Sequence, residues 1–181
     1  MATIYTIGHS TRTLEELVAI LRAHDVGCLV DVRTLRGSRA NPQFNEESLR
    51  RTLPRRKIRY VTMPGLGGRR PKRKDRDEER NAAWENASFR NYADYADTDE
   101  FREALDALVA LSKKCTCTIM CAEAVWWRCH RRIVADHLIA RGVPVVHLMT
   151  ETHEEPATLT PFAKRRGREV DYPRARAPSP R

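Results

Sequence analysis

Residues 3–32 read TIYTIGHSTRTLEELVAILRAHDVGCLVDV, a pattern that indicates a strand, a helix and a second strand. Its first five residues form a short, largely apolar stretch rich in β-branched side chains, which ends at the turn Gly8-His9-Ser10. Thr13 and Glu16 have the spacing of a capping box, and apolar residues follow them at helical intervals. Residues 28–32 are almost entirely apolar, which is typical of a parallel strand buried on both faces. A strand, a helix and a strand within some thirty residues predict a βαβ unit.

The same alternation continues along the chain and predicts the fold class. We expect an α/β fold of three layers, a mostly parallel sheet of about five strands with helices on both faces. The helix from residue 97 is expected to start with a second capping box, formed by Asp97 and Glu100. Residues 1–150 are interpreted as one domain. Further strands are predicted at residues 58–63, 115–120 and 143–149, and further helices at 46–53, 97–113 and 126–141.

Composition narrows the classes of protein. The chain has 181 residues, 41% of them hydrophobic, which suits a folded globule rather than a disordered chain. No run approaches the ~20 apolar residues of a membrane helix, and the first residues do not resemble a secretory signal. Five cysteines, an odd number without a signal, favour reduced thiols in a cytoplasm. Cys28, Cys115 and Cys117 lie in apolar runs and are interpreted as small buried hydrophobic residues.

The positive charge is concentrated in two segments. The chain carries a formal charge of +9, and residues 50–80 alone hold 13 basic against 4 acidic side chains. Residues 67–97 also contain four aromatic residues and are predicted to be a basic, mobile lid, whereas residues 151–181 are predicted to be a basic Pro/Arg-rich tail. Such segments favour nucleic acid (DNA or RNA) or a phosphorylated small molecule as partner, and no membrane. The alternative is a solvated arginine-rich surface.

Polar clusters follow three of the predicted strands. They are Gly8-His9-Ser10, Asp31-Val32-Arg33 and Cys121-Ala122-Glu123. Ligands of open parallel sheets bind at the carboxyl ends of the strands, so we expect these three clusters to meet in one crevice.

Several short motifs follow one another along roughly residues 3–149. They are Ile7-Gly8-His9-Ser10, Asp31-Val32-Arg33, Gly37-Ser38-Arg39, Phe44-Asn45, Leu66-Gly67-Gly68, Tyr92-Ala93-Asp94-Tyr95, Phe101, Met120-Cys121-Ala122-Glu123 and Cys129-His130-Arg131. In their order and spacing these motifs resemble the domain-of-unknown-function family 488 of prokaryotic proteins. The family implies no settled activity. It usually has a proline two residues before the serine of the Gly37-Ser38-Arg39 loop. Arg36 stands at that position here, so we expect a more flexible loop with an added charge.

Two carboxylates are candidates for chemistry. Asp31 either steers a base or sugar or merely caps a loop and pairs with Arg33. Glu123 is expected on the same face as Cys121 and partly desolvated, which suits acid/base catalysis, and the alternative is a salt bridge to an arginine.

The residues from Cys129 to Arg132 are predicted to open a helix, whose N-terminus attracts anions and lowers the pKa of a thiol. Cys121 or Cys129 is therefore also a candidate nucleophile or redox thiol beside His130. Trp126 and Tyr92 are candidates for stacking a base. The cysteine spacing does not match paired zinc motifs, so neither metal nor cofactor is expected.

The leading hypothesis is an enzyme acting on nucleic acid or a nucleotide, by base excision or glycosyl-bond cleavage. The alternatives are a cysteine-based thiol or redox enzyme and a non-catalytic nucleic-acid-binding module. The candidate catalytic residues are Glu123, Asp31, Cys121 and His130, and the candidate binding residues are His9, Ser10, Arg33, Ser38, Arg39, Asn45, Tyr92, Trp126, Cys129, Arg131 and Arg132.

Overall fold

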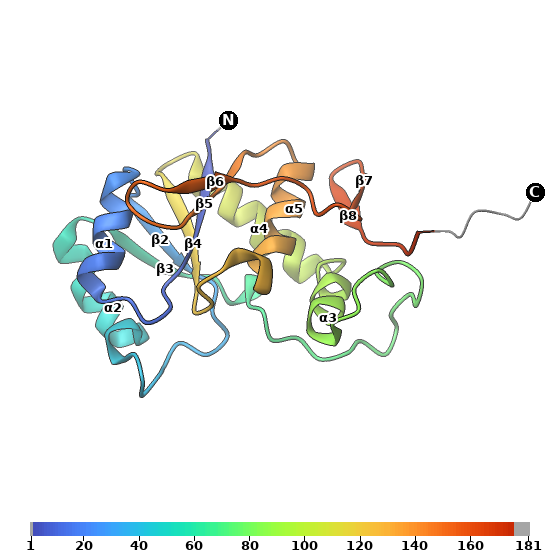
Figure 1. Ribbon diagram of the computed structural model, residues 1–181, viewed down its shortest axis with the longest axis horizontal. Helices are drawn as coiled ribbons and strands as arrows, with labels where there is room; N and C mark the ends of the chain where they lie inside the picture. The colour runs from blue at the N-terminus through green and yellow to red at the C-terminus, as the bar shows by residue number, and fades with distance from the viewer. Residues whose placement is uncertain (1, 176–181) are drawn as a thin grey trace, which may run out of the picture.

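The computed structural model describes residues 2–175, which form a six-stranded sheet in the order β3-β2-β4-β1-β5-β6 (Figure 1). The first five strands of the chain run parallel, and the last, β6, runs antiparallel to β5. The predicted class, α/β with a mostly parallel sheet, is confirmed with one strand more than expected. The strands of this sheet are β1 (Ile4–Gly8), β2 (Cys28–Asp31), β3 (Arg59–Thr62), β4 (Cys117–Cys121), β5 (Val145–Leu148) and β6 (Glu154–Pro156).

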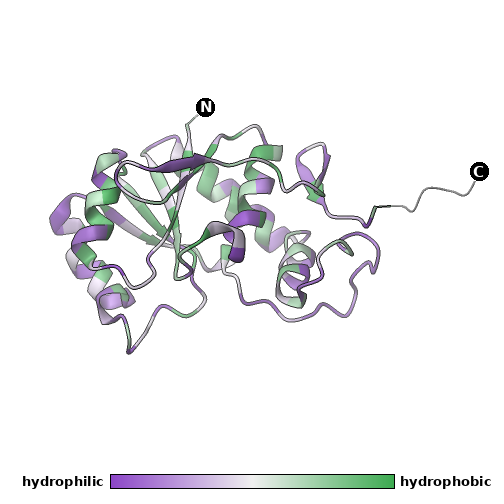
Figure 2. Cartoon of the chain, in the orientation of Figure 1, coloured by the Kyte–Doolittle hydropathy of each residue, from purple (hydrophilic) through white to green (hydrophobic). Residues whose placement is uncertain are grey.

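Helices cover both faces of the sheet and bury one apolar core on each side. Successive strand residues alternate between the cores: Leu29 packs with the α1 and α2 side, and Val30 with the α4 and α5 side. Figure 2 shows inner strands of the sheet such as β4 in green, the hydrophobic end of the scale, whereas the edge strand β6 is purple. No helix within residues 2–175 is long and apolar enough to cross a membrane. The helices are α1 (Leu14–Ala23), α2 (Glu46–Thr52), α3 (Ala87–Tyr95), α4 (Asp99–Ser112) and α5 (Arg131–Ala140), with short 3-10 turns at Pro42–Phe44, Pro54–Arg56, Pro64–Leu66 and Trp126–Arg128.

The two predicted capping boxes have different outcomes. Thr13 and Glu16 form the reciprocal pair at the start of α1, where the Thr13 amide donates to the Glu16 carboxylate at 2.7 Å. The box predicted for α4 is wrong. Thr98 is the N-cap instead, because the carboxylate of Asp97 pairs with Arg80 at 2.9 Å.

The segment expected to be a lid contributes to the core over much of its length. Trp84, Tyr92 and Tyr95 are buried, and Trp84 stacks on Phe89 with ring centroids 4.9 Å apart. The basic loop between residues 68 and 80 is more exposed, and several of its arginines pair with acidic side chains of the same loop. Aromatic burial therefore anchors residues 81–97 to the domain rather than leaving them as a cover over it.

The segment expected to be a tail also packs on the domain as far as it is described. Residues 154–156 form β6, and residues 164–171 form a hairpin of β7 (Lys164–Arg166) and β8 (Glu169–Asp171). Tyr172 follows the hairpin, is fully buried, and donates its hydroxyl to Asp136 at 2.8 Å. The remainder of the predicted tail, residues 176–181, lies outside the described residues.

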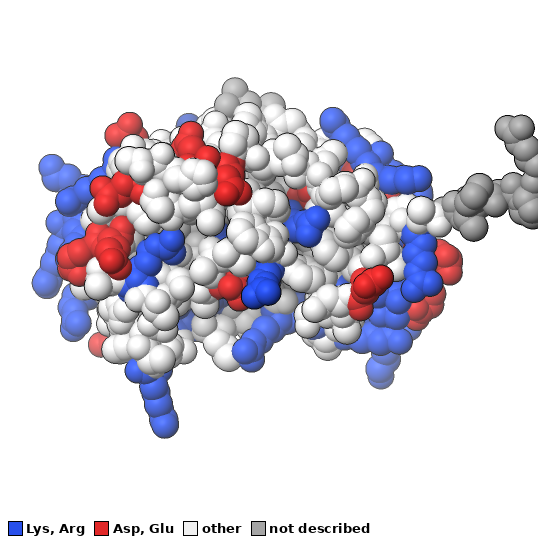
Figure 3. Space-filling view, viewed as in Figure 1, with Lys and Arg blue, Asp and Glu red and all other residues white. Residues whose placement is uncertain are grey.

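On the face of the molecule drawn in Figure 3, charged side chains are spread out rather than joined in one basic patch. On the side drawn in Figure 3, lysine and arginine gather towards both ends of the long axis, with acidic side chains among them. Only a few charged groups lie near the middle of that view.

Candidate active site

Two adjoining hollows lie at the carboxyl ends of β1, β2 and β4, where parallel sheets usually bind ligands. The larger has a volume of about 510 Å³ and the smaller about 350 Å³. Arg33, Ala122 and Glu123 line both of them. The structure thus brings together the three strand-end clusters, because β4 lies between β1 and β2 in the sheet.

Close backbone packing holds the loop after β4 against the loop after β1. The His9 amide donates to the carbonyl of Cys121 at 2.9 Å. A side chain on Gly8 would place its Cβ 1.8 Å from the carbonyl oxygen of Glu123, so only glycine fits there. Ser10 adopts a left-handed conformation with φ of +50°, which residues with a side chain rarely occupy. The crossing of the two loops is therefore tight and locally strained.

Asp31 is placed to orient an arginine and not to touch a ligand. Its carboxylate has no exposed surface and accepts from Arg33 Nη2 at 2.6 Å and from the Tyr60 hydroxyl at 2.6 Å. Burial and this carboxylate raise the pKa of Tyr60, so its hydroxyl stays a donor. Asp31 lines neither hollow. The predicted catalytic role of Asp31 is not supported, because its carboxylate already accepts hydrogen bonds from two buried partners.

Arg33, the partner of Asp31, also contacts His9, and both side chains line the smaller hollow. The Arg33 guanidinium donates to Nε2 of His9 at 3.2 Å, while Nδ1 of His9 donates to the Ser10 carbonyl at 2.8 Å. Burial lowers the pKa of His9 to about 4, which keeps the ring neutral at pH 7 and its Nε2 free to accept. Arg33 is thus held rigidly with one side on the hollows.

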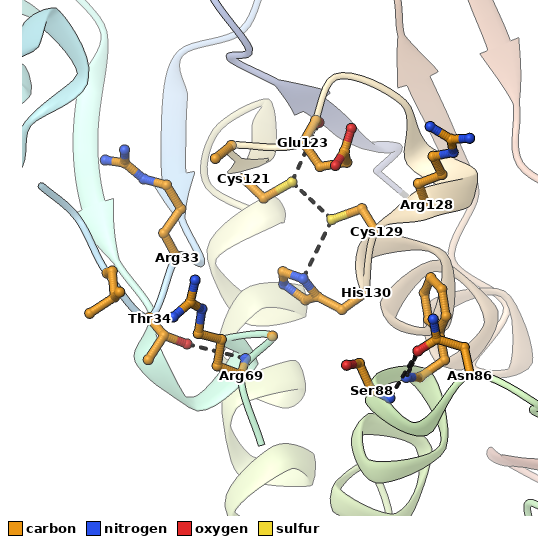
Figure 4. A pocket seen from close by; sticks show the side chains of 14 residues that line it. Arg33, Thr34, Arg69, Asn86, Ser88, Cys121, Glu123, Arg128, Cys129 and His130 are labelled. Atoms are coloured by element: carbon orange, nitrogen blue, oxygen red, sulfur yellow. Dashed lines mark hydrogen bonds between the residues drawn. The ribbon is translucent and has the colours of Figure 1, made fainter. Parts of the chain in front are cut away.

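Two thiols and a histidine form the floor of the larger hollow (Figure 4). The sulfurs of Cys121 and Cys129 are 2.9 Å apart, and His130 Nδ1 lies 3.4 Å from the Cys129 sulfur. Burial raises the pKa of Cys121 well above its usual value. Burial also acts to raise the pKa of Cys129, but hydrogen bonds from Cys121 and His130 and the charge of Arg131 lower it well below the usual value. Of the two thiols, Cys129 is therefore the one whose surroundings favour ionisation.

The position of His130 depends on a glycine across the hollow. A Cβ on Gly68 would lie 2.3 Å from Nδ1 of His130, so the glycine lets the ring approach the loop after β3. Nε2 of His130 is buried and has no hydrogen-bond partner among residues 2–175. Because buried polar atoms normally have a hydrogen-bond partner, this ring nitrogen beside the Cys129 thiol can form a hydrogen bond with a bound ligand.

Arg131 and Arg132 do not reach the hollows, contrary to the expectation that they hold phosphates. Arg131 is 1% exposed and donates to the carbonyl of Glu123 at 2.8 Å. It therefore positions the loop after β4 and supplies positive charge to the thiols. Arg132 donates to Thr160 at 2.8 Å and packs its guanidinium over the ring of Trp84.

Glu123 is exposed, not partly desolvated as predicted. The strand ends at Cys121, so the side chain of Glu123 belongs to a turn between the two hollows and not to the buried end of β4. No ion pair to an arginine is formed by Glu123 among the described residues. Its location on the rim still permits contact with a ligand.

The two aromatic residues predicted to stack a base, Tyr92 and Trp126, instead contact other residues of the chain. Tyr92 is fully buried, with its hydroxyl donating to the Leu66 carbonyl at 2.8 Å. Trp126 stacks on His147 with ring centroids 4.4 Å apart and lines neither hollow. The aromatic ring that does line the larger hollow is Phe89, which the sequence placed only in a presumed lid.

The loop after β2 is tethered rather than loosened. Arg36, in place of the family's usual proline, donates to Glu46 at 2.7 Å and to the Arg33 carbonyl at 3.0 Å. The amide of Ser38 donates to the Asn45 side chain at 2.7 Å, and Ser38 lines the smaller hollow. Arg39 and Asn45, both predicted to bind a ligand, line neither hollow. Asn45 instead stabilises the loop through its hydrogen bond with Ser38.

Sequence reasoning missed two cations on the rim of the larger hollow, Arg69 and Arg128 (Figure 4). Both side chains are exposed. Arg69 opens the basic run after β3, and Arg128 directly precedes Cys129, so their place in the sequence was a usable signal. Asn86 and Ser88 at the start of α3 add polar groups to the same rim. Within residues 2–175, no three potential metal ligands gather in this hollow.

Comparison with known proteins yields one match. A family model described as "Domain of unknown function DUF488" matches residues 13–138, which include both pocket thiols, His130 and Arg33. No curated protein and no solved structure matches the chain.

Proposed function

The chain belongs to the family described as domain of unknown function DUF488, and we propose that it is a thiol-dependent enzyme acting on a phosphate-bearing substrate of the nucleotide class. The observation that carries the proposal is the pair of thiols on the floor of the arginine-rimmed hollow, where the sulfurs of Cys129 and Cys121 lie 2.9 Å apart. A thiolate is the reactive form of cysteine, and it needs the positive surroundings that His130 and Arg131 provide.

The proposed step is nucleophilic. The Cys129 sulfur forms a bond to an electrophilic atom of the substrate, and the bond from that atom to the leaving group breaks with its electron pair. His130 or the Cys121 thiol gives the leaving group a proton. Water then attacks the same atom, and the bond from that atom to sulfur breaks and restores the thiolate. A proton of the water returns to the group that protonated the leaving group.

The rim favours an anionic substrate. Arg69 and Arg128 contribute positive charge to the larger hollow, which Arg33 also lines while it is paired with Asp31. Asn86 and Ser88 add neutral hydrogen-bonding groups. Guanidinium groups suit phosphate oxygens because they donate in a planar fork. Phe89 provides an aromatic surface at the same hollow, against which a base can lie.

The base-excision variant of this function is less well supported. It used Glu123 or Asp31 as the carboxylate and Trp126 or Tyr92 as the stacking ring. Asp31 and Tyr92 are fully buried and engaged within the protein, and Trp126 stacks on His147. Glu123 keeps a place on the rim, where it can contact the substrate beside the thiolate.

The test is alkylation of the reduced protein with iodoacetamide across a range of pH, with the modified cysteines mapped by mass spectrometry. We expect Cys129 to react at a pH well below the ordinary thiol pKa of about 8.5. Inorganic phosphate and nucleoside monophosphates should slow this reaction. The matched control is Cys115, which is half-buried and distant from the hollow.

Variants separate catalysis from binding. In a turnover screen of nucleotides and phosphorylated metabolites, Cys129→Ala should abolish activity while Cys115→Ala retains it. Arg69→Gln should weaken nucleotide binding, and Arg166→Gln, an exposed residue of the β7–β8 hairpin, should not. Alkylation of Cys115 ahead of Cys129 at every pH, without protection by any phosphate, would refute the proposal.

A further inference from the structure

A second group of sulfurs lies at the opposite edge of the sheet. Cys28 starts β2, Cys117 starts β4, and the two are paired neighbours in the parallel register. Cys115 comes two residues before Cys117, just after the end of α4. Because β4 runs four residues from Cys117 to Cys121, this group lies about 13 Å from the thiols of the hollow.

The three sulfur atoms form a compact triangle. All of them lie within 4.8 Å of one another, and those of Cys115 and Cys117 are 3.7 Å apart. Three sulfurs bound to one ion at about 2.3 Å stand about 4.0 Å apart when the arrangement is planar, and slightly less when it is pyramidal. The triangle therefore has the size of a three-sulfur metal site without rearrangement of the strands.

Burial in an apolar core would bring two of these thiols together simply through the strand register. Two further features go beyond such packing. Cys115 is only half-buried, so an ion has a path to the sulfurs. The side chain of Arg59, at the start of β3, contributes positive charge near Cys28 and Cys115. That charge favours the ionised thiols which a metal requires. The thiols of this group lose their protons as the ion binds.

We propose that Cys28, Cys115 and Cys117 bind one thiophilic d¹⁰ metal ion, Cu(I) or Zn(II), at a site separate from the hollow. Thiolates are the ligands that select such ions. No fourth cysteine, histidine or carboxylate joins the triangle among residues 2–175, which suits three-coordinate Cu(I) directly. Zn(II) would complete its four ligands with water.

The test uses the full chain, reduced and freed of metal. Cu(I) is titrated in competition with bicinchoninic acid, Zn(II) in competition with a pyridylazo dye, and Co(II) is added as a spectroscopic probe. We expect one ion per chain by native mass spectrometry and a sulfur-to-Co(II) charge-transfer band. The two competition titrations rank Cu(I) against Zn(II).

Cys115→Ser should weaken binding by about 100-fold or more, since losing a ligand costs at least as much as losing an outer-shell partner. Cys129→Ser is the matched control: it removes a thiol of the hollow and should bind the ion as the unmodified chain does. Cys28→Ala repeats the test should Cys115→Ser fail to fold, as judged by circular dichroism.

The proposal is overturned if the unmodified chain takes no ion from either competitor, or if the Cys115→Ser variant binds as tightly as the unmodified chain. Loss of binding in Cys129→Ser alone would also overturn it, because the ion would then sit in the hollow. Alkylation of Cys129 and its protection by phosphate are read independently of these titrations, so the two proposals fail separately.

Discussion

Replacing Asp31 with asparagine tests whether this carboxylate is a structural partner of Arg33. Asp31 has no exposed surface, and its carboxylate accepts two hydrogen bonds from the Arg33 side chain, at 2.6 and 2.9 Å. The Asp31→Asn variant keeps the shape of the side chain and removes its charge. The guanidinium, itself only 6% exposed, is then left without its counter-charge.

The expected loss of stability is large. Removing one partner of a buried ion pair costs about 3–5 kcal/mol, because the other charge stays desolvated. For a chain of this size the free energy of unfolding falls by about 2 kcal/mol for each molar of urea. The urea midpoint of Asp31→Asn should therefore lie about 1.5–2.5 M below that of the unmodified chain.

Tyr60→Phe is the matched control, since it removes one hydrogen bond to the same carboxylate and leaves the ion pair intact. It should cost about 1.5–3 kcal/mol, the range for a hydrogen bond to a charged group. An Asp31→Asn midpoint within about 0.3 M of the unmodified chain would refute the reasoning, since the pair would then contribute almost nothing to folding.

Three further predictions follow from other buried groups. Burial lowers the pKa of His137 to about 3 in the folded chain, against about 6.5 unfolded, so its contribution to stability is present above pH 6.5 and is lost as the pH falls towards 3. We expect about 2 kcal/mol of this loss between pH 7 and pH 5 in urea unfolding, and a smaller loss in His137→Gln. Gly8→Ala should destabilise the fold by at least about 2 kcal/mol through its clash with a backbone carbonyl, whereas Gly37→Ala, which meets open space, should stay within about 0.5 kcal/mol in thermal unfolding. Tyr172→Phe should cost about 1.5–3 kcal/mol by removing the hydroxyl that donates to a buried carboxylate, and an unchanged melting temperature would contradict this.

Local sequence patterns were enough to predict several of the strands and helices. The apolar run at residues 28–32 and the capping box at Thr13 needed no distant partner, so both were predictable from spacing alone. The meeting of three polar strand ends was predictable too, because parallel strands in one sheet end at the same edge. The short strands after residue 150 were missed, since β6 depends on pairing with β5 and carries no strong apolar pattern.

The roles of the polar residues were decided by contacts that sequence spacing does not show. Asp31 is buried because Tyr60 and Arg33 close over it, and Arg131 is buried because the turn at Glu123 accepts its hydrogen bonds. Whether a strand-end side chain faces a hollow or the interior depends on what packs against it from elsewhere in the chain.

The sequence by itself therefore determined the α/β class, the mostly parallel direction of the strands and the edge of the sheet where the polar strand ends meet. Those properties follow from hydrophobic periodicity and chain direction, which are local. Only the tertiary structure decided that the neighbours of Cys129 lower its pKa and that Arg69 and Arg128 form the rim. Burial and charge at a site are sums over neighbours from many segments, and they exist only after the chain has folded.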